Sequence, residues 1–402
     1  MDFSDDRKPK GEPFTMKYLN QEKLNELLEK RTAEDMADGR IGGTGLCVMQ
    51  DGKEIYKAYH GKWSYEQDIP LTVENGDSTI FRLASMTKPI TAIATLIQVS
   101  RGKLGLDDPI TDLLPQFADM WVGELKEDKV VAKEPAKRVL TPRMLLSHQN
   151  GLHAGDLGNR QGLGTPEDMQ DLAHIVDYVA TLKLDFQPTE AQMYSPTAAF
   201  DVCARLVEIT SGMDYNTFVT KEIFEPLGMT NTTFLPTDEQ WSRFIIMHNR
   251  KETDGHGESE DAQTQPGSIF ESFPLTWFSG GAGLCSTLPD YVKFAEMLVN
   301  EGRLPDGTQL VPAELIRDMA TPCVPFEVMP ARERWGLGVR VITEEHWMPK
   351  TCFGWSGAYG SHFWVDPVNK ITAVYMKNSR YDGGAGSQTS SYFEQDVYAC
   401  LE

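Results

Sequence analysis

The chain has 402 residues, 40% hydrophobic and 10% aromatic, enough for a substantial core in one large domain or two to three smaller ones. Its formal net charge of −21 argues against nucleic acid or an anionic membrane as a partner, because both require basic patches. The six cysteines form no C-x-x-C pair and the eight histidines no H-E-x-x-H motif. We therefore expect no metal ion and no other cofactor.

The N-terminal part combines a polar segment with a helix and a hairpin. Residues 1–15 have no apolar signal core, and no apolar run in the chain reaches bilayer length. We therefore expect a disordered tail, no membrane span and a cytoplasmic location. Asn20 is a candidate cap for a helix that ends near Gly39. Strands over 45–50 and 54–59 flank the hairpin turn Asp51-Gly52.

The segment Ser85-Met86-Thr87-Lys88 begins an apolar helical pattern that stops near Gly102. Residues i and i+3 of a helix share a face, so the Lys88 amine can reach the Ser85 hydroxyl. A neighbouring base activates a serine, and the helix N-terminus offers N–H groups to an oxyanion. This is the S-x-x-K arrangement. The alternative is an N-cap serine with a surface lysine, the interpretation we prefer for Ser100 to Lys103, which repeats the spacing at the helix end.

The region from about 104 to 270 is predicted to be mostly helix and loop, with a polar, acidic surface loop over 251–267. Strand signals then return, and a helix closes the chain over 387–401. Strands at both ends of the chain around a helical middle predict an α+β fold, in which an antiparallel sheet is made from the N- and C-terminal parts. The C-terminal strand signals cover 336–342, 351–359, 361–365 and 371–377.

Two further segments carry candidate site residues. Tyr194 stands just before Ser195-Pro196, a helix cap with proline at the first position, and a phenol near a lysine is a plausible base. The alternative is a packing tyrosine. Gly354-Trp355-Ser356-Gly357-Ala358 lies on a predicted strand, where the Ala358 N–H can serve an oxyanion hole. The segment nearly matches G-x-S-x-G, but only His362 follows Ser356, so we reject an α/β-hydrolase.

Together and in this order, these segments resemble the serine β-lactamase and penicillin-binding protein superfamily, especially its class C branch and the family VIII carboxylesterases. The resemblance runs from about Ile41 to the C-terminus. It implies a β-lactamase-like fold without a cofactor, an acylated nucleophile at Ser85, and proton transfer shared by Lys88 and Tyr194. Which of those two is the base stays open. It further implies an oxyanion hole from the Ser85 and Ala358 N–H groups. The other matching segments are 104–109, 145–152 and 280–284.

Two departures from that family narrow the substrate. Its β-lactamases and peptidases usually carry asparagine two residues after the tyrosine, where this chain has Pro196. They also begin the strand motif with a cation that holds a substrate carboxylate, whereas here the substrate-binding triplet is Trp355-Ser356-Gly357. A nearby Lys377 or Arg380 could replace the cation. Both departures favour a small, moderately apolar acyl ester.

The sequence therefore predicts a serine esterase that works through an acyl-enzyme, with possible transacylase and weak β-lactam activity. The alternatives are a β-lactamase or D-amino-acid-specific peptidase or amidase, and a non-catalytic sensor protein of the same fold. The expected partner is a small ester or amide. We expect residues 16–402 to form one domain, with an α/β lobe over about 16–82 and 280–402 and a helical lobe over about 83–279. Trp277, Phe278 and Tyr359 are candidates for the walls of the acyl pocket.

Overall fold

The computed structural model of the chain describes residues 16–162, 164–165, 167–253, 256–262, 277–325, 328, 332–344 and 346–402. The tail predicted over 1–15 and part of the loop predicted over 251–267 lie outside the described residues. No described helix is both long enough and apolar enough to cross a bilayer.

An eight-stranded sheet is built from the two ends of the chain. Its order, β10-β11-β12-β13-β14-β1-β2-β3, puts the C-terminal β14 beside the N-terminal β1, and neighbouring strands run antiparallel. The predicted α+β fold, with a sheet made from both ends, is confirmed. The strands are β1 (Gly43–Gln50), β2 (Lys53–Ser64), β3 (Ile69–Pro70), β10 (Glu333–Trp335), β11 (Arg340–Ile342), β12 (Phe353–Ser356), β13 (His362–Asp366) and β14 (Ile371–Lys377).

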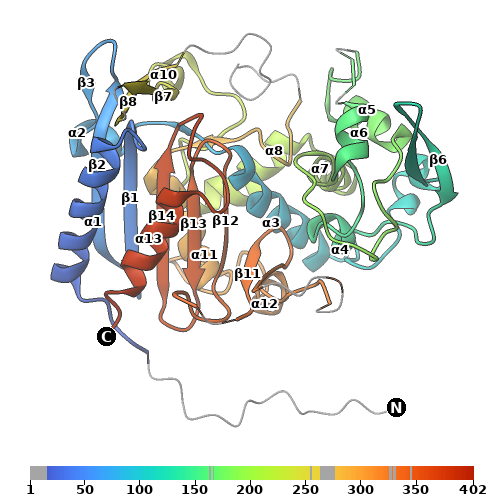
Figure 1. The fold of residues 1–402 in the computed structure, drawn as a ribbon. Helices are drawn as coiled ribbons and strands as arrows, with labels where there is room; N and C mark the ends of the chain where they lie inside the picture. Colours follow the sequence, from blue (N-terminus) through green and yellow to red (C-terminus); the bar gives the residue numbers. More distant parts are fainter. Residues whose placement is uncertain are drawn as a thin grey trace.

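Helices cover both faces of this sheet. Figure 1 shows α1 (Gln21–Ala37) and α13 (Gln388–Tyr398) in front of it and α11 (Leu288–Val299) behind it. All seven residues of β14 are buried, because side chains that alternate along a strand here enter two different cores. Ile371 and Tyr375 belong to the core under α1 and α13, whereas Val374 and Met376 join the larger core that includes α11.

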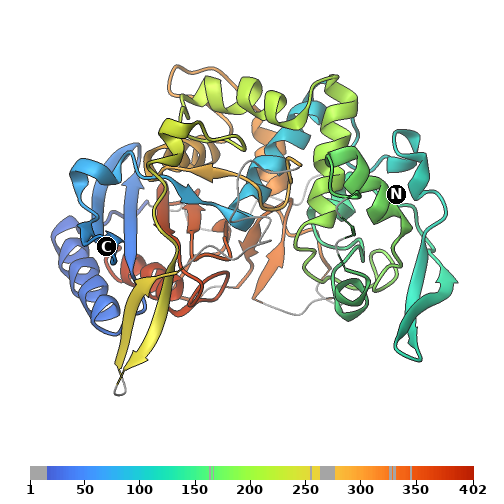
Figure 2. The ribbon, with the colours of Figure 1, turned by 90° about the horizontal axis from the view of Figure 1, so that it is seen from above.

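The middle of the chain forms a mostly helical region beside the sheet (Figure 2). Its centre is α3 (Thr87–Ser100), which is buried from Thr87 to Gln98 and packs on α7 (Ala198–Ser211). The boundaries of the two predicted lobes stay a prediction. The remaining helices are α2 (Val73–Gly76), α4 (Pro142–Leu146), α5 (Asp156–Gln161), α6 (Leu172–Thr181), α8 (Tyr215–Val219), α9 (Glu225–Leu227), α10 (Asp238–Trp241) and α12 (Ala313–Met319), with 3₁₀ turns η1 (Ala84–Met86), η2 (Ile110–Asp112) and η3 (Pro115–Phe117) and a π turn η4 (Thr220–Phe224).

Two hairpins project from the body of the protein where we predicted helix and loop (Figure 2). β5 (Trp121–Lys126) and β6 (Lys129–Pro135) are joined by Glu127 and Asp128, both with positive φ. That turn lacks the glycine that normally signals it in a sequence. β7 (His248–Thr253) and β8 (His256–Asp261) are polar strands without apolar alternation, so the prediction of a surface loop there is wrong. A short pair, β4 (Phe81–Arg82) with β9 (Cys285–Ser286), leads into α3.

A buried hydrogen-bonded chain ties three strands to α13. Ser356 Oγ lies 2.7 Å from His362 Nδ1, and His362 Nε2 lies 3.0 Å from a carboxylate oxygen of Glu394. Glu394 also pairs with the Arg340 guanidinium and accepts a hydrogen bond of 3.0 Å from Trp347 Nε1. Burial alone would raise the pKa of the Glu394 carboxyl, but the Arg340 charge and the His362 hydrogen bond outweigh it and hold that pKa far below its ordinary value.

We predict that Glu394→Ala lowers the free energy of unfolding at pH 7 by about 3–5 kcal/mol, because it removes the buried partner of the buried Arg340 charge and leaves only the part-exposed Glu333 paired with it. Urea unfolding measures this. Since the folded-state pKa of Glu394 is depressed, its contribution is present above the unfolded pKa, and the difference from wild type should shrink below about pH 4. The exposed pair Lys137–Glu190 is the control, and Glu190→Ala should cost less than about 1 kcal/mol. Equal costs would contradict this account.

Candidate active site

Ser85 lies in the turn that joins β4 to α3. The residue before it, Ala84, has φ +46°, which is rare for a residue with a side chain and costs about 1–3 kcal/mol. The strained turn η1 directs the chain straight into α3, so Ser85 and Lys88 stand one helical turn apart. Ser85 is thus partly exposed, while the apolar side chains of the helix that follows it are buried in the larger core.

Lys88 is fully buried, and its ammonium group lies at the centre of the site. Its Nζ is 3.1 Å from Ser85 Oγ. Two backbone carbonyls, of Pro196 and Gly281, accept hydrogen bonds from the same Nζ at 2.5 and 2.7 Å. An ammonium group has three hydrogens to donate, so these three contacts use its full capacity. Three separate segments of the chain therefore meet at one nitrogen.

Tyr194 completes the triad expected from the sequence. Its hydroxyl donates to Ser85 Oγ at 2.7 Å, and Lys88 Nζ lies 4.9 Å from the centre of its ring. Two indoles flank the phenol, with ring centroids at 5.7 Å for Trp335 and 5.4 Å for Trp355. The three groups lie in mutual contact, and Ser85 Oγ is within hydrogen-bonding distance of both candidate bases.

His148 packs against Tyr194 and is hydrogen-bonded to the backbone of the next residue, a role that the sequence did not suggest. Its Nδ1 accepts a hydrogen bond of 3.0 Å from the Ser195 N–H, and its ring lies 4.7 Å from that of Tyr194. Burial, with repulsion from Lys88, places the pKa of His148 far below its ordinary value, so the ring is neutral. Trp335, 4.1 Å from His148, was likewise not singled out, because it reaches the site from a distant strand.

The end of β12 passes close to Ser85 because Gly357 has no side chain. A Cβ at Gly357 would lie 2.2 Å from the Leu83 carbonyl oxygen, two residues before Ser85. Ser361 fixes the same contact, with its hydroxyl donating to Leu83 O at 3.1 Å and its carbonyl accepting the Gly357 N–H at 2.7 Å. Ala358 is exposed, and its N–H has no acceptor within the described parts of the chain. That N–H is available to a bound oxyanion.

The strand motif has two faces with different surroundings. Trp355 is half-buried and lies against Tyr194 and the larger core. Ser356 lies on the opposite face of the strand from Trp355. There its hydroxyl is hydrogen-bonded to the imidazole of His362, the residue beside it on β13. Because side chains alternate along a strand, β12 brings Trp355 and not the Ser356 hydroxyl beside the triad. Contact of Ser356 with substrate stays a prediction that this geometry does not favour.

Lys377 does not replace the missing cation of the strand motif. It is 1% exposed, and its Nζ is bonded to Asp382 at 2.9 Å and to Thr389 at 2.7 Å. The repeated S-x-x-K spacing is also explained, since Ser100 Oγ donates to Ile97 O at the end of α3. Of the residues predicted to line an acyl pocket, Trp277 is buried and donates to Asp201 at 3.3 Å.

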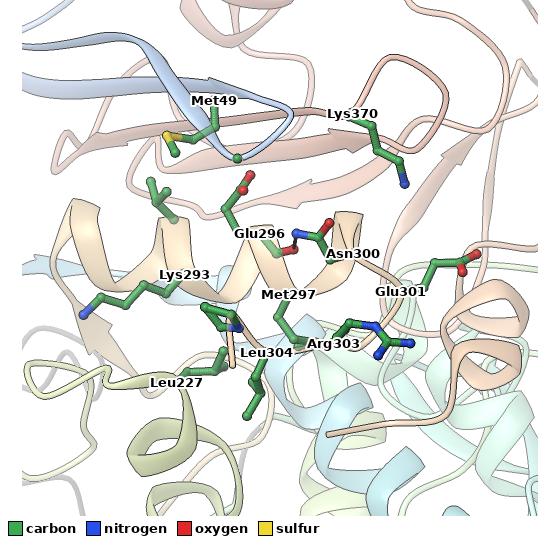
Figure 3. A pocket seen from close by; sticks show the side chains of 13 residues that line it. Met49, Leu227, Lys293, Glu296, Met297, Asn300, Glu301, Arg303, Leu304 and Lys370 are labelled. Carbon is green, nitrogen blue, oxygen red and sulfur yellow. Dashed lines mark hydrogen bonds between the residues drawn. The ribbon is translucent and has the colours of Figure 1, made fainter. Parts of the chain in front are cut away.

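A separate hollow of about 580 Å³ lies between α11 and the sheet turns that contain Gly52 and Lys370 (Figure 3). Met49, Leu227, Met297 and Leu304 give it apolar walls. None of the predicted site residues lines it. It is therefore distinct from the Ser85 region.

Residues 28–393 of this chain match the protein family described as Beta-lactamase. The chain belongs to the beta-lactamase family. It is 28% identical over 396 residues to esterase EstB of Burkholderia gladioli, covering 90% of this chain and 92% of EstB. It is 27% identical to penicillin-binding protein 4 of Amycolatopsis lactamdurans, covering 84% of this chain and 81% of that protein. The resemblance stated from the sequence is confirmed, and with it the class of enzyme, a serine hydrolase.

The fold has close matches among solved structures. EstCE1, a hydrolase with promiscuous acyltransferase activity, superimposes with a TM-score of 0.75 at 23% identity, covering 94% of this chain and 99% of EstCE1. This likeness concerns the fold alone. It confirms the predicted β-lactamase-like architecture.

We predict that Gly357→Ala lowers the rate at which Ser85 is acylated by about 10- to 100-fold, because the added methyl pushes β12 and the Ala358 N–H away from Leu83. Stopped-flow measurement with a fluorescent serine-directed phosphonate checks this. Gly52→Asn is the control, since the turn at Gly52 has open space and asparagine tolerates its positive φ. An unchanged rate in Gly357→Ala would show that the close approach is not needed.

Proposed function

We propose that this protein is a serine esterase that hydrolyses small, moderately apolar acyl esters through an acyl-enzyme on Ser85. The observation that carries this proposal is the position of Ser85 Oγ, 3.1 Å from Lys88 Nζ and 2.7 Å from Tyr194 Oη. A hydroxyl bonded to two groups that can exchange protons is poised to lose its own proton as it attacks a carbonyl.

In the proposed first step, Ser85 Oγ forms a bond to the acyl carbon while its proton passes to the Lys88–Tyr194 pair. The pair reacts in the form that carries one proton fewer, either a Lys88 ammonium with a Tyr194 phenolate or a Lys88 amine with a Tyr194 phenol. The carbonyl oxygen gains negative charge and accepts hydrogen bonds from the N–H groups of Ser85 and Ala358. The bond to the leaving alcohol then breaks, and the alcohol oxygen takes the proton back from the pair. Either Lys88 or Tyr194 can be the group that receives the proton first.

In the second step a water molecule, or an acceptor alcohol, attacks the acyl-Ser85 ester. The same pair accepts the proton of the nucleophile and returns it to Ser85 Oγ, so the acid or a new ester leaves and the enzyme is regenerated. The acceptor alcohol is the basis for possible transacylase activity. Among proteins of the same fold, EstCE1 is described as a hydrolase with promiscuous acyltransferase activity.

The environment of the triad supports an ester rather than an anionic β-lactam. The Pro196 carbonyl is bonded to Lys88, and proline has no side-chain amide to hold a substrate amide. Trp355 provides an apolar surface where a cation would bind a carboxylate, and Lys377 is occupied by Asp382. EstB, which is named as an esterase, aligns along most of the chain.

A β-lactamase or D-amino-acid-specific peptidase or amidase is the second candidate. Its support is the match to penicillin-binding protein 4, which covers most of both chains. A non-catalytic sensor of the same fold is the third, and the intact Ser85, Lys88 and Tyr194 contacts argue against it. A cytoplasmic location and the absence of nucleic-acid partners stay predictions.

We predict that Ser85→Ala lowers turnover of p-nitrophenyl butyrate by a factor of about 10⁴ or more while the protein stays folded, because the nucleophile is lost and only one oxygen atom is removed. Initial rates and thermal melting measure both effects. Ser100→Ala, at the far end of α3 and with the same S-x-x-K spacing, is a matched control and should change turnover less than about twofold. Comparable turnover in Ser85→Ala and wild type would exclude the mechanism.

We further predict that Trp355→Lys raises hydrolysis of a chromogenic cephalosporin relative to p-nitrophenyl butyrate by about tenfold, because it places a cation beside Tyr194 for the substrate carboxylate. Trp355→Leu removes the indole without adding a charge and serves as the control. The ratio of the two kcat/KM values is the readout. If lysine and leucine change this ratio equally, the missing cation does not explain the preference for esters.

A further inference from the structure

The buried Lys88 ammonium has no carboxylate as a direct partner among the described residues, since its three hydrogen bonds go to Ser85 and to two backbone carbonyls. A charged group without exposure requires compensation from dipoles or from a nearby opposite charge. Asp201 is the carboxylate that fills this need, because it is buried on the neighbouring helix α7 and its charge interacts with that of Lys88.

Asp201 is itself held by two donors from the segment that leads to the Gly281 carbonyl. It is 1% exposed, and its two oxygens accept hydrogen bonds from Ser279 Oγ at 2.7 Å and from Trp277 Nε1 at 3.3 Å. A buried carboxylate with a hydrogen bond to each oxygen has a fixed orientation. The carboxylate therefore fixes the 277–281 segment against α7.

The same segment leads directly to the ammonium group. Ser279 Oγ, which donates to Asp201, accepts the Gly281 N–H at 3.2 Å, and the Gly281 carbonyl accepts from Lys88 at 2.7 Å. The segment lies tightly on α7, because a Cβ at Gly280 would be 2.3 Å from the Phe200 carbonyl oxygen. Displacement of Ser279 thus moves the carbonyl that orients Lys88.

We propose that Asp201 is a positioning residue for Lys88: its carboxylate holds the 277–281 segment that carries the Gly281 carbonyl, and it supplies the buried negative charge that balances the ammonium group. The inference rests on the proposed role of Ser85 as nucleophile. Asp201 does not contact Ser85 or substrate. It acts by holding Lys88 in place as an ammonium group, so that the neighbouring Tyr194, in its deprotonated form, is the group that accepts the Ser85 proton.

This arrangement gives the enzyme a pH dependence near neutrality. Burial raises the pKa of Asp201 to about 6, although the hydrogen bonds from Ser279 and Trp277 and the charge of Lys88 act in the opposite direction. As the pH falls through 6, the carboxyl becomes neutral and ceases to balance the charge of Lys88. Reactivity of Ser85 should fall with it.

Other titratable groups face Asp201 from the surrounding elements. His153, which follows α4, lines a small cavity together with Asp201, and burial lowers the pKa of His153 below its ordinary value. Tyr178 on α6 also lines the cavity, while Tyr215 on α8 and Cys203 on α7 interact with the Asp201 charge. Burial raises the pKa of each of these phenols and of the thiol, so they stay neutral at pH 6. His153 is therefore the group to control for.

The test measures the second-order rate of Ser85 phosphonylation by a fluorescent fluorophosphonate from pH 5 to 9. Wild type should show a loss of rate below about pH 6. Asp201→Asn keeps the size of the side chain but removes its charge, so the acidic limb should disappear and the rate at pH 8 should fall by about tenfold or more. Ser279→Ala removes a bond that stabilises the carboxylate and should move the limb to higher pH. His153→Gln should leave the limb in place.

Thermal melting separates positioning from folding. The folded-state pKa of Asp201 lies above its unfolded value, so its contribution to stability is largest at low pH and is lost as the pH rises through 6. Asp201→Asn should therefore melt at or above the wild-type temperature at pH 8 while reacting more slowly. Asp201→Asn with an unchanged pH profile, or a limb that moves in His153→Gln but not in Ser279→Ala, would overturn the inference.

The proposed function is tested separately by the same samples. Wild type that reacts with the fluorophosphonate at Ser85 but turns over no ester contradicts the esterase and leaves the Asp201 result interpretable. Wild type that reacts with neither contradicts the role of Ser85, and the inference falls with it.

Discussion

One buried nitrogen joins the parts of the chain that form the site. Lys88 Nζ is hydrogen-bonded to Ser85 in the turn before α3, to the Pro196 carbonyl before α7 and to the Gly281 carbonyl between the helical region and the sheet. An ammonium group buried without these acceptors would be strongly unfavourable, so the fold must keep all three segments in register. The packing of the helical region and the geometry around the Ser85 hydroxyl thereby depend on the same contacts.

The position of the strand β12 is a second constraint on the site, because the side chains on its two faces make different contacts. Trp355 faces the triad, while Ser356 joins His362 and Glu394 under α13. The buried pair of Glu394 with Arg340 makes that rear face rigid. In the proposed mechanism the exposed Ala358 N–H is an oxyanion donor, and such a donor acts only when its position is fixed before the reaction.

Local patterns in the sequence predicted the elements that depend on local rules. The spacing of Ser85 and Lys88 on an apolar helix was sufficient to place them together, and β14 was predicted with its observed limits, 371–377. The hairpin at Asp51-Gly52 and the helix capped by Asn20 are confirmed for the same reason. The arrangement of the sheet followed from the order of the elements along the chain.

The rest depends on contacts between distant residues, for which one sequence has no signal. Trp335, His148 and Asp201 acquire their roles from neighbours that are 47 to more than 100 positions away. The near match to G-x-S-x-G likewise shows that a local motif does not determine where its serine lies in the fold. Ser356 does bond to a histidine and through it to a carboxylate, yet on the face of β12 opposite to the triad.

Acid-quench mass spectrometry of the protein during turnover of p-nitrophenyl butyrate tests the central claim most directly. We expect one butyryl group per chain, attached to Ser85 in the peptide that contains Ala84 to Lys88. Butyrylation of a different residue, or turnover that proceeds without any acylated protein in a quench faster than one cycle, would contradict it.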